Sequence, residues 1–395
     1  MMLVKTKDEL SDLAAVYLNI SLIVHLMEYI YEYLTRFRID QNARIELQLI
    51  VVLFICFRII KNGKIRVNSF VIMTSMIWVF IISFSYFLFN PADYLVKEIV
   101  IEGFSHIIVP VYLISLISDI DKFVKALKKF MPLVILYCLM QFIYKTDNYN
   151  EYFIFTYSIL PTALFLIAYE RKEATIKYKI VCAFIFMSLL LFGTRSALLC
   201  IGIELCILSC FFLNLKEKMF AVLSLLMVII PIYFFYDDIV FAFVQVFPGA
   251  RISSFLSGQQ VDNSRSIIWA ELLARVLECP FVVRGVLSDR LILSSLWGYF
   301  EPAQIRAWYA HNFVVEILYG FGILGFLILI VFFSKLYRAY RLCRKDKSNN
   351  SVIIFATFTS YFIGKLSVSS SYLFDISTGY IIGVLYILFK HGCKS

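Results

Sequence analysis

A histidine and an asparagine adjoin at His311 and Asn312, where a polar stretch meets the apolar run FVVEILYGFGILG. A neutral imidazole can accept a proton near neutral pH, and the chain contains only four histidines. Two arginines, Arg195 in FGTRSALL and Arg265 in DNSRSIIW, stand in the first turns of segments that read as helices. Guanidinium groups bind phosphates through paired hydrogen bonds, and helix N-termini offer unpaired backbone N–H groups. These residue types indicate diphosphate binding with proton transfer beside it.

The sequence around these residues is typical of a membrane protein. Hydrophobic residues make up 61% of the 395 residues and charged residues 16%, whereas a soluble domain has about half and about a quarter. Apolar runs long enough to cross a bilayer recur along the chain. We therefore expect an all-α, polytopic integral membrane protein that forms one membrane domain over residues 1–395. About twelve transmembrane helices are expected, at 12–34, 45–60, 69–89, 99–117, 131–145, 153–169, 178–193, 197–213, 219–236, 311–333, 352–370 and 372–390.

Lysine and arginine alternate between the connecting loops. Loops rich in them are 61–68, 118–130, 170–179, 214–218 and 334–351, and the loops between these are poor in them, except for 35–44. By the positive-inside rule, both termini lie in the cytoplasm. The large loop 237–310, between the ninth and tenth expected helices, then lies outside the cytoplasm. Arg195, Arg265 and His311 would all lie at the outer membrane surface.

The large loop contains one clear helix signal at 262–280. Three good N-cap residues open this segment and Pro280 ends it. The apolar stripe between them consists of Ile268, Trp269, Leu272, Leu273 and Val276. We expect a short amphipathic helix that lies along the outer membrane surface.

Each candidate residue also has a plain structural interpretation. An arginine at a membrane boundary, such as Arg195, commonly extends toward lipid headgroups. Arg265 would be an ordinary surface arginine, and His311 a hydrogen-bonded boundary residue. Gly322 and Gly325 would allow close helix packing. The functional interpretation depends on all three outer residues being near one another.

The histidine segment has a recognisable pattern. It reads His-Asn, nine residues, Gly, two residues, Gly, with the glycines at positions 322 and 325. This resembles the hallmark of the bacterial O-antigen ligase and O-antigen polymerase superfamily. FGTRSALL is similar to the family's arginine motif at the outer start of a helix, and SRSIIWAELLARVLECPF to its second arginine motif.

A late stretch adds to this resemblance. KLSVSSSYLFD (365–375) resembles the late segment of capsule and exopolysaccharide polymerases. The likeness covers roughly residues 150–390. CPFVVRG departs from it, because Val283 and Arg284 stand where family members often have a second glycine.

The resemblance implies glycosyl transfer from a sugar carried on undecaprenyl diphosphate. An acceptor hydroxyl would attack the anomeric carbon while undecaprenyl diphosphate leaves. Arg195 and Arg265 would bind the diphosphate, and His311 would accept the proton or, alternatively, hydrogen-bond the phosphate. Asn312 and Glu316 would orient the reacting groups.

Three functions fit this sequence. Two are enzymes that differ in the acceptor of the sugar, and the third is a transporter. A polymerase would join lipid-linked repeat units of O-antigen, capsule or exopolysaccharide, and the SSSYL and FTYSILP stretches favour it. A ligase would transfer finished polymer to lipid A–core. A transporter or flippase of lipid-linked oligosaccharide would have the same number of helices, but transporters place polar residues near the bilayer midplane.

The resemblance also implies where the enzyme is located and which partners it has. We expect it in the bacterial cytoplasmic (inner) membrane, with a chain-length regulator and a flippase as partners besides the lipid-linked oligosaccharide and the growing polysaccharide or lipid A–core acceptor. No cofactor and no metal are expected, since two arginines can neutralise a diphosphate. Arg284 and Arg290 of the large loop would support the site.

Other ionisable residues leave alternatives open. Asp119 and Asp121 have the spacing of a metal motif, but they are better explained as the N-terminal cap of the basic helix that follows. Asp237 and Asp238 are a second metal candidate. Lys365 and Asp375 lie in apolar runs, where they would be functional or would pair structurally.

Overall fold

The computed structural model describes most of the chain, and the described part is helical. The described residues are 2–35, 50–55, 57–58, 61, 68–89, 100–144, 149–173, 175–214, 216–217, 265–298, 309–345 and 349–392. Of these residues, 87% are helical and none lies in a strand. The all-α prediction is therefore confirmed for the described part of the chain.

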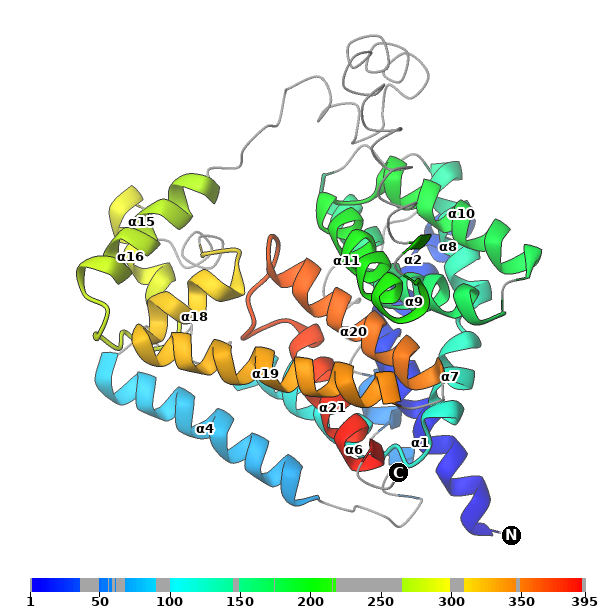
Figure 1. Ribbon diagram of the computed structural model, residues 1–395. Coiled ribbons are helices and arrows are strands. Elements are labelled where there is room, and N and C mark those ends of the chain that lie inside the picture. The colour runs from blue at the N-terminus through cyan, green and yellow to red at the C-terminus, as the bar shows by residue number, and fades with distance from the viewer. Residues whose placement is uncertain are drawn as a thin grey trace.

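Figure 1 shows the described helices, coloured in the order of the chain. Their bounds are α1 (Met2–Leu18), α2 (Ile20–Thr35), α4 (Ser69–Phe89), the π-helix η1 (Phe104–Ile108), α6 (Val109–Ser115), α7 (Ile120–Lys128), α8 (Met131–Tyr144), α9 (Tyr149–Glu173), α10 (Ile176–Phe192), α11 (Arg195–Phe212), α15 (Arg265–Glu278), α16 (Ser288–Trp297), α18 (Phe313–Phe321), α19 (Ile323–Lys345), α20 (Asn349–Leu366) and α21 (Ile376–Gly392).

Helix α20 forms the centre of the fold. Nearly all of its residues are buried, and it packs against α7, α9, α11, α19 and α21. Figure 1 shows α20 in orange, with the green helices α9 and α11 on one side and the gold α19 on the other. The turn that follows α20 is thus attached to a helix that is buried nearly throughout.

The structure contains four helices that are long and apolar enough to cross a membrane, among the residues it describes. They are Ser69–Phe87, Ile120–Ile143, Phe153–Arg171 and Ile323–Lys345. The number rises to five if the pair Glu9–Leu18 and Ile20–Thr35, which bends by 62°, is one span. The apolar side chains of α4 and α19 are largely exposed, as expected for helices that face lipid.

Several expected spans have different bounds in the structure. The basic segment 118–130 is not a loop, because α7 occupies it and belongs to the candidate span Ile120–Ile143. The segment 334–351 is helical as far as Lys345. The expected spans 69–89 and 153–169 are confirmed as candidate spans. Residues 219–236, the expected ninth span, lie outside the described residues.

The expected span 311–333 is wrong, since the chain breaks there at Gly322 into α18 and α19. Gly322 has a φ of 55°, and a Cβ on it would lie 2.3 Å from the carbonyl oxygen of Pro280. That carbonyl accepts a hydrogen bond of 2.8 Å from the backbone N–H of Ile323. Only glycine fits such a close approach of two backbones at positive φ. Helix α18 is therefore a separate short helix before the membrane span of α19.

The predicted helix 262–280 is observed as α15, but its apolar stripe faces protein. Ile268 and Leu272 are fully buried against α16 and α18. Trp269 and Val276 pack beside them, whereas Leu273 is exposed. The expectation that this stripe lies on a membrane surface is therefore wrong. The stripe instead joins α15 to the start of α18.

Candidate functional site

The candidate site is built around residues 309–312, which we call the histidine loop. This loop is held by neighbouring helices through its Ala310 backbone. The N–H of Ala310 donates to Asp289 Oδ2 on α16 at 2.9 Å. Its carbonyl accepts from Trp269 Nε1 on α15 at 2.6 Å. Two helices of the large loop, α15 and α16, thus fix the position of the histidine loop.

The histidine loop leads directly into helix α18. Asn312 is the N-cap of that helix, and its Oδ1 accepts from the backbone N–H groups of Val314 at 2.9 Å and Val315 at 3.3 Å. His311 has a φ of 51°, a left-handed conformation that costs free energy for a residue other than glycine. Its ring lies 3.8 Å from the ring of Tyr309. The cap and the ring contact together hold the imidazole at the start of the helix.

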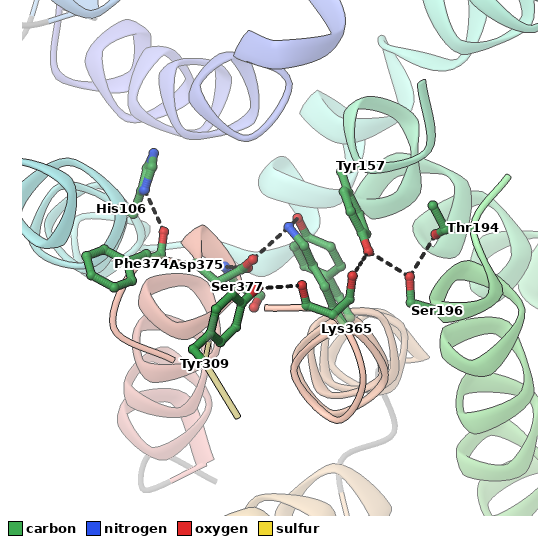
Figure 2. A network of polar contacts seen from close by, with 11 residues as sticks. His106, Tyr157, Thr194, Ser196, Tyr309, Lys365, Phe374, Asp375 and Ser377 are labelled. Carbon is green, nitrogen blue, oxygen red and sulfur yellow. Dashed lines mark hydrogen bonds and ion pairs between the residues drawn. The ribbon is translucent and has the colours of Figure 1, made fainter. Parts of the chain in front are cut away.

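A second segment, residues 367–375 between α20 and α21, meets the histidine loop; we call it the serine turn. Tyr309 donates to the carbonyl oxygen of Ser369 at 3.0 Å. The hydroxyl of Ser369 also hydrogen-bonds Tyr157 of α9. Tyr157 in turn lies 2.8 Å from Ser196 Oγ, in the first turn of α11 (Figure 2). The serine turn therefore connects α9 and α11 to the histidine loop.

These contacts link three helices to the histidine loop. Trp269, one turn from the start of α15, contacts the histidine loop directly. The start of α11 reaches the loop through Tyr157 and Ser369. The start of α18 is the loop itself. Because a helix N-terminus carries the positive end of the dipole, the start of α18 at the histidine loop favours an anion.

A buried ion pair crosses the serine turn. Lys365 Nζ lies 2.8 Å from Asp375 Oδ2, and both side chains are almost fully buried. The same Nζ lies 4.3 Å from the centre of the Tyr157 ring and donates to Tyr361 at 3.3 Å. Figure 2 shows this pair between His106, which contacts the carbonyl of Phe374, and the Tyr157 branch. Lys365 and Asp375 thus form an ion pair, as expected if their role is structural.

A third set of groups lies beneath the histidine loop. The guanidinium of Arg290 lies 4.8 Å from the Tyr309 ring and 4.6 Å from the Phe374 ring. Asp289 precedes it on α16, and Glu316 of α18 accepts a hydrogen bond from Ser371 of the serine turn. We call Asp289, Arg290 and Glu316 the buried charge cluster.

Comparison with models of known protein families, with curated proteins and with solved structures finds no match to this chain. The argument about function therefore depends on the residues and geometry of this molecule.

The sequence-predicted residues are brought together to different extents. His311 and Asn312 form the histidine loop, and Glu316 and Arg290 lie next to it in the buried charge cluster. Arg195 is the first residue of α11, and the next residue, Ser196, hydrogen-bonds Tyr157. Arg265 is the first residue of α15, one helical turn before Trp269.

Arg284 lies apart from these residues. Its guanidinium donates to the carbonyl oxygen of Arg275 at 2.9 Å and lies 4.9 Å from the ring of Tyr319. Its backbone N–H donates to Gly320 at 2.8 Å. Arg284 therefore binds the C-terminal end of α15 to the end of α18, which is a structural position.

The two metal candidates have different outcomes. Asp119 caps α7, accepting from the N–H groups of Asp121 at 2.9 Å and Lys122 at 3.4 Å, as predicted. Asp237 and Asp238 lie outside the described residues. Within the described part of the chain, no group of three or more His, Cys, Asp and Glu side chains is placed to hold a metal.

Sequence reasoning missed several residues that connect the site. Tyr157, Tyr309 and Ser369 link the histidine loop to α9 and α11, and Asp289 fixes Ala310. Nothing in composition separates these two tyrosines from the other tyrosines of the chain. The four serines near residue 370 were a usable signal, because hydroxyl groups gathered after a buried helix need partners.

Proposed function

We propose that this chain is a membrane glycosyltransferase that polymerises oligosaccharide repeat units carried on undecaprenyl diphosphate, at the outer face of the bacterial cytoplasmic membrane. One observation carries the proposal: the histidine loop, which begins α18, is hydrogen-bonded to α15 through Trp269 and is linked to the start of α11 through Tyr157 and Ser369. Helix N-termini suit a diphosphate, and the arginine motifs begin α11 and α15. The motif resemblance supplies the reaction class.

In the proposed reaction, the acceptor hydroxyl oxygen forms a bond to the anomeric carbon of the donor sugar. The bond from that carbon to the diphosphate oxygen breaks, and its electron pair leaves with undecaprenyl diphosphate. Arg265 and Arg195 stabilise the negative charge that develops on the leaving group. His311 takes the proton that the acceptor hydroxyl loses. Asn312 keeps the histidine at the start of α18 through its cap hydrogen bonds.

An apolar groove supports a lipid-linked donor. It has a volume of about 600 Å³ and lies between α18 and α19. Val314 and Leu318 line it from α18, and Phe326, Ile330 and Phe333 line it from α19. It begins two residues after Asn312 and continues along a helix whose apolar side chains are exposed as for lipid contact. A prenyl chain in this groove would have its diphosphate near the histidine loop.

Reconstitution of the purified protein in vesicles tests the proposal. Undecaprenyl-diphosphate-linked repeat units are supplied in the presence of a chelator, and the products are separated by size. A ladder of repeat-unit multiples is expected. His311→Ala should reduce its rate by about 10²–10⁴-fold, the usual contribution of general-base catalysis. His391→Ala, at the far end of α21, is the matched control and should leave the ladder unchanged.

Other outcomes point elsewhere. Transfer that begins only when lipid A–core is added would make the protein a ligase. Movement of lipid-linked sugar between leaflets without any new glycosidic bond would refute the enzyme and indicate a transporter. A ladder that requires a divalent cation would refute the metal-independent chemistry.

A further inference from the structure

The buried charge cluster contains more negative than positive groups. Asp289 is 1% exposed, Glu316 is 4% exposed and Arg290 is 2% exposed. They come from two helices, α16 and α18, which pack against each other beneath the histidine loop. Two carboxyl groups therefore share one guanidinium in a site that water does not reach.

Each carboxyl group holds a different part of the proposed site. Asp289 Oδ2 accepts the backbone N–H of Ala310 in the histidine loop at 2.9 Å. Glu316 Oε1 accepts the hydroxyl of Ser371 in the serine turn. The Ser371 hydroxyl in turn accepts from the backbone N–H of Leu373 at 3.3 Å. The two carboxyl groups thus fix both segments from below.

Electrostatics allows one of these carboxyl groups, but not both, to be charged. A buried carboxylate is stable only with a compensating charge and hydrogen bonds, and a second like charge beside it disfavours ionisation. Burial raises the pKa of Asp289, but the adjacent guanidinium of Arg290 and the backbone N–H of Ala310 both favour its charged form. Glu316 accepts one hydroxyl at Oε1, and its Oε2 has no hydrogen-bond partner among the described residues. An uncharged Oε2 costs less free energy there than an ionised one.

We propose that Glu316 carries a proton in the working site, and that Glu316 and Asp289 are positioning residues that hold the serine turn and the histidine loop in register. This inference rests on the proposed glycosyl transfer for its effect on activity. Its statement about the proton stands on the cluster itself. Ionisation of Glu316 would add a second negative charge beside Asp289 and would weaken the contact between the two segments.

The electrostatic surroundings agree with this assignment. Burial, and then the charge of Asp289, raise the pKa of Glu316 to about 8. Arg290 acts in the opposite direction but does not offset these effects. Other charged and titratable groups on the elements around Glu316 include Tyr309 and His311 of the histidine loop, Tyr319 of α18, Tyr372 and Asp375 of the serine turn, Lys365 at the end of α20, and Arg265, Glu271, Arg275 and Glu278 of α15.

The proton itself can be observed without any assay of activity. In infrared spectra of protein labelled with ¹³C-glutamate, subtracting the Glu316→Gln spectrum from the wild-type spectrum should leave a protonated-carboxyl C=O band at pH 6.5, which disappears as the pH rises through about 8. The subtraction removes the signals of other buried glutamates, such as Glu204. Asp289→Asn should move the loss of the Glu316 band to lower pH, because the neighbouring negative charge is gone. Glu278→Gln, an exposed residue at the end of α15, is the matched control and should change nothing.

Activity then tests the positioning role. If the protonated form is required, the polymerisation rate of the wild type should fall about fivefold between pH 8 and pH 9, as the protonated fraction of Glu316 falls. Glu316→Gln keeps the size and the acceptor oxygen, so it should stay within about twofold of the wild type at pH 6.5 and should lose this alkaline fall. Glu316→Ala leaves Ser371 without its acceptor and should lose activity more than about tenfold at every pH.

The outcomes separate the inference from the proposed function. If the difference between the wild-type and Glu316→Gln spectra contains no such band at pH 6.5, the protonation assignment is wrong. An inactive Glu316→Gln that is folded would show that Glu316 accepts the reaction's proton, which also overturns the assignment. If no polymer forms with any variant but the band behaves as expected, the proposed function fails while the protonated Glu316 stands.

Discussion

Removing one partner of the Lys365–Asp375 pair should destabilise the protein more than removing both. The Nζ–Oδ2 distance is 2.8 Å, and the side chains are 10% and 4% exposed. Coulomb's law gives about 6 kcal/mol for unit charges at this distance with an effective dielectric constant of about 20. Part of that attraction offsets the cost of removing both charges from water. Lys365→Met leaves Asp375 charged without its partner, and breaking such a pair costs about 3–5 kcal/mol.

The double variant Lys365→Met, Asp375→Asn provides the comparison. With no buried charge remaining, its free energy of unfolding should lie within about 2 kcal/mol of the wild type. SDS-induced unfolding in mixed micelles measures each value. Arg275→Met is the matched control, since it breaks the half-exposed pair with Glu271 at 2.7 Å and should cost at most about 1 kcal/mol.

The same variants decide between the two alternatives for this pair. A double variant that is stable and still forms polymer would make the pair structural. A stable double variant that forms no polymer would place one of the two groups in the reaction. The electrostatic reasoning is refuted if the single and double variants unfold with equal free energies, because the cost would then come from packing.

Two further predictions concern the junction of α18 and α19. Gly322→Ala should lower the free energy of unfolding by about 1–3 kcal/mol, because alanine is strained at positive φ and its Cβ would collide with the carbonyl oxygen of Pro280. Gly202→Ala is the control: a Cβ there has open space around it, so the substitution should not destabilise the protein. Ile330→Trp should fill part of the apolar groove and raise KM for a donor with a full-length prenyl chain by roughly tenfold, with little effect for a short-chain donor. Val331→Trp, equally exposed to lipid but outside the groove, is its control, and an equal rise in KM there would count against the groove.

Hydropathy predicts much of the helical structure but does not show where neighbouring helices break a run. The runs at 69–89 and 153–169 become candidate spans because each is a single uninterrupted apolar helix. The run at 311–333 reads the same way in sequence, yet it breaks at Gly322. The cause is a hydrogen bond from the backbone N–H of Ile323 to the carbonyl oxygen of Pro280, a residue that lies outside this apolar run. A glycine in such a run allows a break, and only the tertiary contact requires it.

Part of the candidate site could be predicted from the sequence, because polar residues stand at the start of an apolar run. The part that depends on tertiary packing could not. His311 and Asn312 stand out because polar residues seldom precede an apolar run without a reason, and Asn312 does cap α18. The resemblance predicted Arg290 and Glu316 as supporting residues, but nothing in the sequence showed that both are buried. Their burial depends on α16 packing against α18, and this packing follows from the positions of Asp289 and the histidine loop in three dimensions.

The position of the serine turn explains why a site at the histidine loop can be rigid. The turn begins at the end of α20, whose side chains are buried nearly throughout, so its start is fixed by the core. Tyr309, Tyr157 and Glu316 then attach to it from three different helices or loops. Reacting groups must be held to within about half an ångström of their working geometry, and elements anchored in a core achieve this better than free loops. The histidine loop is short and strained at His311, but it is fixed on one side by α15 and α16 and on the other by a turn that the core itself holds.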